Sequence, residues 1–134
     1  MKILIADDMP DVGKRLERLL RNLPGVTTVN YCASADDAIL RLLELQPDLL
    51  LLDHRLESHG NRAVLRKVPH YSPHTEVCIY SELLAEIDRS SFEQSEIKGF
   101  YEKSGDFDTL LSHVEDRARR LRDVNASKKY VPMN

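Results

Sequence analysis

The most constraining feature of the sequence is a run of four leucines, Leu49 to Leu52, that ends in Asp53. A short, continuous apolar run is typical of a central strand in a parallel sheet, which helices cover on both faces. The carboxylate at its end matters too, because open parallel sheets place their sites at the carboxyl ends of the strands. The run therefore predicts a layered α/β fold and a location for its chemistry.

Short apolar runs alternate with longer helical patterns along the rest of the chain. Four further segments have strand-like length and composition, namely residues 2–6, 26–31, 77–80 and 99–102. Apolar residues at helical spacing predict helices over residues 10–23, 34–47 and 61–68, and from residue 106 onward. Residues 82–96 are less regular, and we expect a short, exposed or mobile helix there, because Ser90 and Ser91 are mediocre helix formers.

This alternation predicts an α/β domain in which a five-stranded parallel sheet carries helices on both faces. The 134 residues fit one domain of ordinary size. Apolar periodicity fades beyond Asp123. We therefore assign residues 1–123 to the domain and residues 124–134 to a C-terminal tail or truncated linker.

The composition excludes several classes of protein. The net charge of −3, from 19 basic and 22 acidic residues, gives no global reason to expect nucleic acid as a partner. Two cysteines do not indicate a disulfide framework. The apolar runs are too short for a membrane span or a secretory signal. We expect a cytoplasmic protein without membrane contact.

Polar side chains follow four of the five predicted strands. Asp7 and Asp8 follow the first, Asp53 ends the third, Ser81 follows the fourth and Lys103 follows the fifth. The carboxyl ends of parallel strands meet at one edge of the sheet, so these five side chains are expected to converge.

Three carboxylates a few ångströms apart repel one another, and at least one of them would have a raised pKa. A hard divalent cation relieves this repulsion, and Mg²⁺ typically takes one or two carboxylates together with waters and phosphate oxygens. Asp53 can then act as a nucleophile and form an acyl phosphate. The cation and Lys103 would neutralise charge on the phosphoryl oxygens, and Ser81 could donate a hydrogen bond to one of them.

In order and approximate spacing, these five residues resemble the functional positions of response regulator receiver domains. The resemblance covers residues 1–123. It implies a flavodoxin-like sheet with the strand order 2-1-3-4-5. It also implies a phosphoacceptor, Asp53, a Mg²⁺ site made by Asp7, Asp8, Asp53 and the backbone carbonyl of Arg55, and a switch pair, Ser81 and Phe100.

Four positions depart from the usual pattern of that family. Glu57 stands where a proline is common, and the loop from residue 53 to residue 60 is about one residue short. Glu82 follows the switch hydroxyl, where a small residue is usual, and could narrow access to the site or pair with Arg55. Ser104 replaces a proline after Lys103, so a cis peptide bond is not expected there. These departures put the rates of phosphorylation and hydrolysis in question.

The resemblance implies a signalling module that receives a phosphoryl group from a sensor histidine kinase or a phosphotransfer protein. Such a chain catalyses only its own phosphorylation and dephosphorylation, and is not otherwise an enzyme. Homodimerisation on phosphorylation is plausible, and nucleic acid would be contacted only through an output domain outside this chain. The sequence does not identify the kinase, the stimulus or the output.

Two other functions remain open at this point. The chain could be an atypical receiver that binds partners without phosphorylation, with Glu82 or the short loop as the obstruction. It could also be a small hydrolase that acts on phosphoesters through Asp53, although no lid or specificity loop is evident. Failure to bind Mg²⁺ would favour the first alternative, and turnover of added phosphoesters would favour the second.

Overall fold

The computed structural model describes residues 1–56, 60–82, 85, 87–92, 95–103 and 105–129, with residues 125–129 described by their backbone alone. Five strands alternate with four α-helices in this part of the chain: β1 (Lys2–Ala6), α1 (Pro10–Arg21), β2 (Thr28–Cys32), α2 (Ala35–Leu45), β3 (Leu49–Asp53), α3 (Gly60–Tyr71), β4 (Glu76–Ser81), β5 (Ile97–Glu102) and α4 (Phe107–Lys129). A 3-10 helix, η2 (Arg89–Phe92), lies between β4 and β5.

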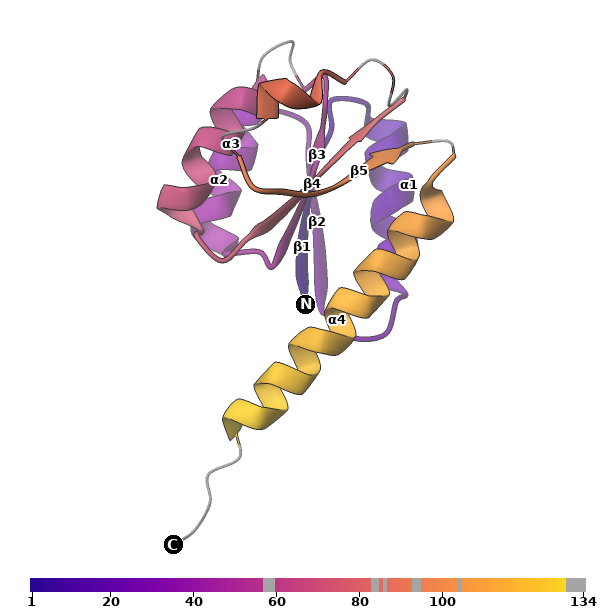
Figure 1. Cartoon of the computed structure of the whole chain (residues 1–134), viewed down its shortest axis with the longest axis vertical. Coiled ribbons are helices and arrows are strands. Elements are labelled where there is room, and N and C mark those ends of the chain that lie inside the picture. Colours follow the sequence, from indigo (N-terminus) through magenta and orange to yellow (C-terminus); the bar gives the residue numbers. More distant parts are fainter. Residues whose placement is uncertain (57–59, 83–84, 86, 93–94, 104, 130–134) are drawn as a thin grey trace, which may run out of the picture.

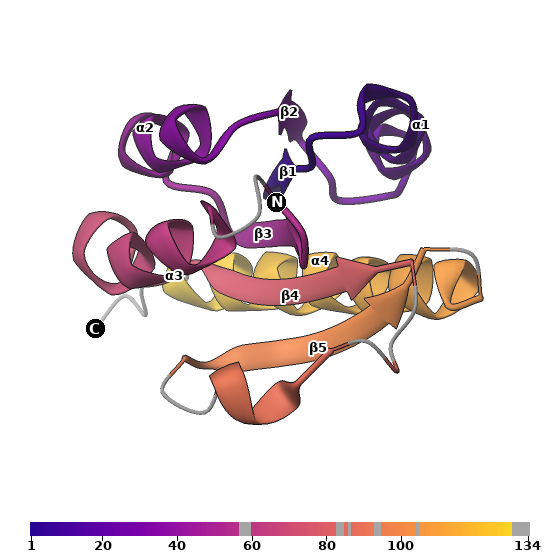
Figure 2. The ribbon, with the colours of Figure 1, turned by 90° about the horizontal axis from the view of Figure 1, so that it is seen from above.

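The five strands form one parallel sheet in the order β2-β1-β3-β4-β5, which Figure 2 shows from above. The predicted fold class and strand order are therefore confirmed. The leucine run forms β3, in the centre of the sheet, and Leu49 to Leu52 are all 0% exposed.

The sheet separates two hydrophobic cores, because successive side chains of a strand point to opposite faces. Helices α2 and α3 cover one face and helices α1 and α4 the other, as Figure 1 shows. Leu50 and Leu52 belong to the core of the α2–α3 face, and Leu49 and Leu51 to the core of the α1–α4 face. Burying each leucine contributes about 1.5–3 kcal/mol.

The ends of α2 are fixed by side chains. The Ser34 hydroxyl accepts a hydrogen bond from the Asp37 N–H, so this serine caps the helix as its position before Asp37 suggests. At the other end Gln46 adopts a left-handed backbone (φ 48°). Its side-chain amide donates to the carbonyl oxygens of Leu42, in α2, and Tyr71, at the end of α3. Gln46 therefore ties the two helices of the α2–α3 face together.

The segment between β4 and β5 differs from the helix predicted for residues 82–96. Its described residues form the short η2 and no α-helix. The Ser91 hydroxyl donates to the Asp88 carbonyl, and the Ser90 N–H donates to the Asp88 carboxylate. Such local bonds compete with the regular helical pattern, which explains the short element. Ile87 and Phe92 are buried in the core of the α2–α3 face.

Two helices extend beyond their predicted ends. Helix α3 runs from Gly60 to Tyr71, past Pro69, which lies in its last turn. Helix α4 continues to Lys129, so the first residues of the predicted tail are helical, while the domain boundary at residue 123 stays a prediction. No helix among the described residues is both long and apolar enough to cross a bilayer.

Only the first part of α4 packs on the sheet. Leu110, Val114 and Ala118 are buried, at the four-residue spacing of one helix face. Farther along the helix Val124 is 49% exposed. In Figure 1 the end of α4 extends well beyond the edge of the sheet.

Candidate functional site

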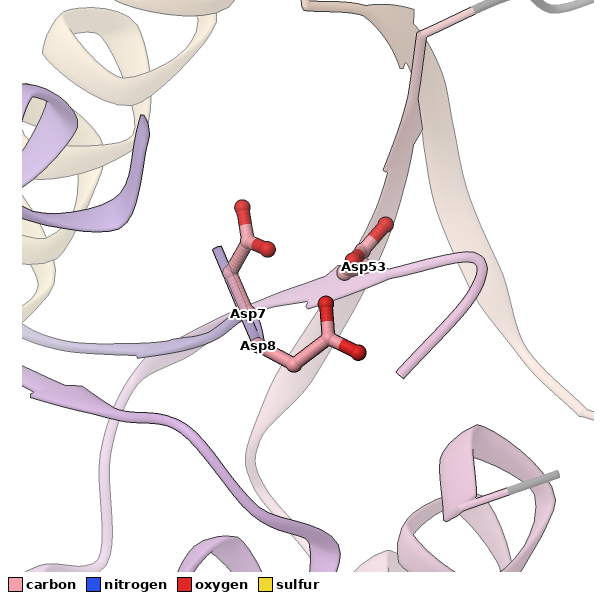
Figure 3. Close-up of side chains that lie close together, drawn as sticks. All are labelled: Asp7, Asp8 and Asp53. Carbon is pink, nitrogen blue, oxygen red and sulfur yellow. The ribbon is translucent and has the colours of Figure 1, made fainter. Parts of the chain in front are cut away.

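Three carboxylates meet at the carboxyl edge of the sheet. Asp7 and Asp8 follow β1, and Asp53 ends the neighbouring strand β3. Each offers an oxygen that lies within 4.8 Å of the oxygens of the other two, and Figure 3 shows the three side chains together. Asp7 and Asp53 are buried, whereas Asp8 is exposed. The predicted proximity of these residues is thus present in the structure.

A buried ammonium group lies between two of these carboxylates. The Nζ atom of Lys103 is 3.1 Å from Oδ2 of Asp7 and 3.3 Å from Oδ1 of Asp53. The Lys103 side chain is 8% exposed, so the attraction is screened little by solvent. Among the contacts known for the described residues, this one ammonium faces two buried carboxylates, so negative charge exceeds positive charge within this buried group.

Asp53 has a raised pKa in this cluster. Burial, and then the charge of Asp7, raise the pKa of the Asp53 carboxyl group to about 6, against the lowering effects of Lys103 and the Arg55 N–H. The Arg55 N–H donates to Oδ1 of Asp53 over 3.3 Å. At neutral pH Asp53 is therefore mostly ionised and able to act as a nucleophile.

Oxygen donors in this arrangement suit a hard divalent cation. Mg²⁺ and Ca²⁺ prefer carboxylate and carbonyl oxygens, and Mg²⁺ uses only one or two carboxylates with waters and phosphate oxygens. Asp7, Asp8 and Asp53 supply the carboxylates and the negative charge that such an ion would neutralise.

Tyr80 belongs to the same cluster, although the sequence analysis assigned it no role. Its hydroxyl donates to Oδ2 of Asp7 over 2.7 Å, and Nζ of Lys103 lies 4.8 Å from the centre of its ring. Burial, then Asp7, raise the pKa of Tyr80 well above its usual value, so the hydroxyl keeps its proton and acts as a donor. The sequence carried no signal for this contact, because it depends on the register of β3 and β4, in which residue 80 lies opposite Asp53.

The two predicted switch residues lie farther along the same edge. Ser81 ends β4 and is 2% exposed. Phe100, in β5, is half-buried, with its ring 6.0 Å from that of Phe92 in an edge-on arrangement. The guanidinium carbon of Arg89 lies 4.7 Å from the centre of the Phe100 ring. Residues of the β4–β5 connection therefore hold this ring in place.

The unusual positions are only partly visible. Glu82 is exposed and lines a cleft beside the site together with Arg15, Tyr80 and Lys103. Glu57, most of the shortened loop and Ser104 lie outside the described residues, so the expectations about them are untested. The role of the Arg55 carbonyl as a ligand also stays a prediction.

Most of the chain, including this edge of the sheet, matches a known protein family. Residues 3–115 match the family described as the response regulator receiver domain. The chain belongs to this family. A role in two-component signalling follows from membership, and the resemblance inferred from the sequence is confirmed.

Curated relatives carry the same region within longer proteins. The response regulator GacA of Pseudomonas aeruginosa is 22% identical over 131 residues, which cover 98% of this chain and 58% of GacA. The transcriptional regulatory protein BtsR of Salmonella typhimurium is 30% identical over 118 residues, covering 87% of this chain and 44% of BtsR. A protein-glutamate methylesterase/protein-glutamine glutaminase of Geobacter sulfurreducens is 26% identical over 131 residues, which cover 92% of this chain and 34% of that protein. The chain thus spans 34% to 58% of the length of these relatives.

Solved receiver domains share the fold at low sequence identity. The signal receiver domain of NarL from Mycobacterium tuberculosis superposes with a TM-score of 0.75 at 23% identity, covering 88% of this receiver and 95% of that chain. The response regulator domain of CheB from Thermotoga maritima gives a TM-score of 0.72 at 18% identity, covering 90% of this chain and 94% of the CheB domain. The receiver fold is therefore present over nearly the whole chain.

Proposed function

We propose that this receiver is a phosphorylation-controlled switch in which Asp53 accepts a phosphoryl group in a Mg²⁺-dependent reaction. The observation that carries the proposal is the position of Lys103, whose ammonium contacts Asp53 and Asp7 while Asp8 completes a cluster of three carboxylates. A nucleophile, a positive charge for the phosphoryl oxygens and a cation site are thereby combined at one edge of the sheet.

The phosphoryl donor in this proposal is a phosphohistidine on a sensor histidine kinase or a phosphotransfer protein. A carboxylate oxygen of Asp53 attacks the phosphorus, the P–N bond of the donor breaks, and the imidazole leaves with the bonding electrons and takes up a proton. Lys103 is placed to neutralise a phosphoryl oxygen. A Mg²⁺ ion bound by Asp7, Asp8, Asp53 and the Arg55 carbonyl would neutralise further phosphoryl oxygens. The reaction would take place in the cytoplasm.

The readout of the switch is assigned to Ser81 and Phe100. The Ser81 hydroxyl would donate to the phosphoryl group, a bond to a charged acceptor that contributes about 1.5–3 kcal/mol. About 3 kcal/mol takes a 1:10 equilibrium to roughly 16:1, so one such bond suffices to shift the population. Phe100 would then turn inward and leave its contacts with Arg89 and Phe92. The surface changed in this way would bind a partner, a second copy or an output domain.

The test is the intact mass of the protein after incubation with Mg²⁺ and acetyl phosphate. Wild type is expected to gain one phosphoryl group, and Asp53→Asn is expected to gain none. Asp36→Asn is the matched control, because Asp36 lies in the first turn of α2, away from the site, and this variant should behave as wild type.

No gain with acetyl phosphate would require the same assay with a phosphorylated histidine kinase as donor. If neither donor modifies the wild type, the proposal is wrong and the chain acts as a phosphorylation-independent interaction module. Glu82→Ala would then show whether this exposed side chain obstructs the site.

A further inference from the structure

Within the part of the chain that the structure describes, Tyr80 is the one aromatic residue that contacts both Asp7 and Lys103 of the proposed phosphorylation site. Its hydroxyl donates to Oδ2 of Asp7, and the ammonium of Lys103 lies 4.8 Å from the centre of its ring. Tyr80 is 2% exposed and Asp7 is 0% exposed, so water does not compete for this hydrogen bond.

Asp7 is held by three donors at its two oxygens. Oδ1 accepts the Met9 N–H over 2.9 Å, and Oδ2 accepts both the Tyr80 hydroxyl and the Lys103 ammonium, at 2.7 Å and 3.1 Å. The Met9 N–H belongs to the loop that leads into α1, and Lys103 is shared with Asp53. Among these three donors, the Tyr80 hydroxyl comes from a strand inside the sheet, β4, and contacts the Asp7 carboxylate.

The position of Tyr80 follows from strand geometry. Residues of β4 alternate between the two faces, so Tyr80 lies on the α1–α4 face with Cys78, whereas Ser81 lies on the other side with Ile79. In the sheet register Tyr80 is opposite Asp53 and next to Tyr101, two residues before Lys103. The side chain is thus directed between the strands that supply the acceptor and the ammonium.

We propose that Tyr80 is a positioning residue of this site, which orients the Asp7 carboxylate for cation binding through its hydroxyl and supports Lys103 with its ring. The inference rests on the proposed function, because it concerns the same cation site. Groups that orient metal-binding side chains typically change metal affinity by 10–100-fold when they are removed. Tyr80 acts through Asp7 and Lys103 and has no direct part in the transfer.

The test uses Tyr80→Phe, which removes the hydroxyl and keeps the ring. Mg²⁺ titrations of the unphosphorylated protein, followed by the amide signals in ¹H–¹⁵N NMR spectra, give the Kd and show in the same spectra that the fold is kept. Tyr80→Phe is expected to weaken Mg²⁺ binding about tenfold. At saturating Mg²⁺ its rate of modification by acetyl phosphate should approach that of wild type, because the defect lies in occupancy.

Tyr31→Phe is the matched control. The Tyr31 hydroxyl also donates to Asp7 over 2.7 Å, but to its backbone carbonyl and not to its carboxylate. Its removal should leave the Mg²⁺ Kd within about twofold of wild type, in contrast to the tenfold effect expected for an orienting group. A second control compares the single variant Asp7→Asn with the double variant Asp7→Asn/Tyr80→Phe. The two should bind Mg²⁺ with equal affinity, because residue 7 then has no carboxylate for the Tyr80 hydroxyl to orient.

Three results would overturn the inference. The first is an unchanged Kd for Tyr80→Phe when wild type binds Mg²⁺, which leaves the proposed function intact. The second is a loss that persists in the Asp7→Asn background, which would show that Tyr80 does not act through Asp7. The third is no Mg²⁺ binding by wild type, which would remove the proposed cation site itself. If Tyr80→Phe fails to fold, the Asp7→Asn pair, which lacks the buried charge, still shows whether Tyr80 affects Mg²⁺ affinity independently of Asp7, which would overturn the inference.

Discussion

The two faces of the sheet are built from the same strands but carry different side chains at the carboxyl edge. On the α2–α3 face the described hydrophobic core is formed by aliphatic side chains with Cys32 and Phe92, and the buried Ser81 at the carboxyl end of β4 is polar but uncharged. On the α1–α4 face the leucines of β3 give way at that edge to Asp53, Tyr80 and Lys103. The α2–α3 face therefore combines packing with uncharged polar groups, whereas the α1–α4 face combines packing with a charged cluster.

This difference shows that the apolar packing that stabilises the sheet and the charged side chains of the candidate site lie largely on different faces. Side-chain alternation gives each strand residues for both tasks, so the apolar face can hold the sheet while the other face carries buried charges that are costly to bury. If the separation is real, substitutions on the two faces should affect unfolding and cation binding differently.

The largest effect is expected from truncating the core on either side of β3. Leu50→Ala removes a fully buried side chain from the α2–α3 face, and Leu51→Ala does the same on the α1–α4 face. Each should lower the free energy of unfolding by about 2–5 kcal/mol, because the lost burial and the remaining cavity add. Urea denaturation measures both. A much smaller loss for Leu51→Ala would show that the α1–α4 face depends mainly on its polar contacts.

A smaller effect of opposite sign is expected for Asp53→Asn in the absence of divalent cations. The pKa of Asp53 is raised to about 6, so the folded state binds this proton more tightly than the unfolded chain does. The associated stability is fully present below the unfolded pKa, near 3.9, and is lost as the pH rises through about 6. In EDTA at pH 7.5 the variant should be more stable by roughly 1–3 kcal/mol, because neutral Asn avoids burying a charge beside Asp7. The loss of the ion pair with Lys103 offsets part of this gain.

The same denaturation at pH 4 is the control for this prediction. There Asp53 holds its proton in the folded state, and the difference between variant and wild type should nearly disappear. A difference that is equal at both pH values would mean that the charge of Asp53 is not what destabilises the cation-free receiver.

A loss of about 1 kcal/mol is expected when the cap of α2 is removed on the packing face. Ser34→Ala leaves the Asp37 N–H without its side-chain acceptor. Thermal or urea unfolding measures the loss, with Ser112→Ala, an exposed position inside α4, as the control that should change little. Mg²⁺ affinity should be unchanged in Ser34→Ala, and a change would argue against the separation of the two faces.

The smallest effect is expected at an exposed ion pair on α2. Nε of Arg41 lies 3.3 Å from Oδ1 of Asp37, and both side chains are more than one third exposed. Arg41→Ala should therefore change the free energy of unfolding by less than about 0.5 kcal/mol. The change should shrink further in high salt, and a salt-independent loss would point to packing by the arginine stem.

Most of the fold could be predicted because its signals are local. The leucine run, the proline and serine at helix starts and the short apolar segments each identify an element without knowledge of its neighbours. The segment after Ser81 could not be predicted in this way, since Ser90 and Ser91 both donate hydrogen bonds to Asp88 and shorten the helix. The extension of α4 past residue 123 could not be predicted, because the apolar periodicity fades there, and Val124 is 49% exposed.

The candidate site was predictable as far as strand ends reveal it. Asp7, Asp8, Asp53 and Lys103 each follow a strand, and their convergence needs only a parallel sheet. Tyr80 was missed because a tyrosine inside a strand is usually a core residue, and its contact with Asp7 depends on the register between β3 and β4. The register is a property of the whole sheet and cannot be predicted from the sequence of a single strand.

Helix α4 has a mechanical consequence that follows from its partial packing. Among its side chains that the structure describes, as far as Val124, the last buried one is Ala118, and from there to Lys129 the helix extends for roughly 16 Å at 1.5 Å per residue. A tilt of about 10° in the packed half would move the far end by roughly 3 Å. A small repacking of the helix beside the charged cluster would therefore give a larger displacement of its far end, well away from the sheet.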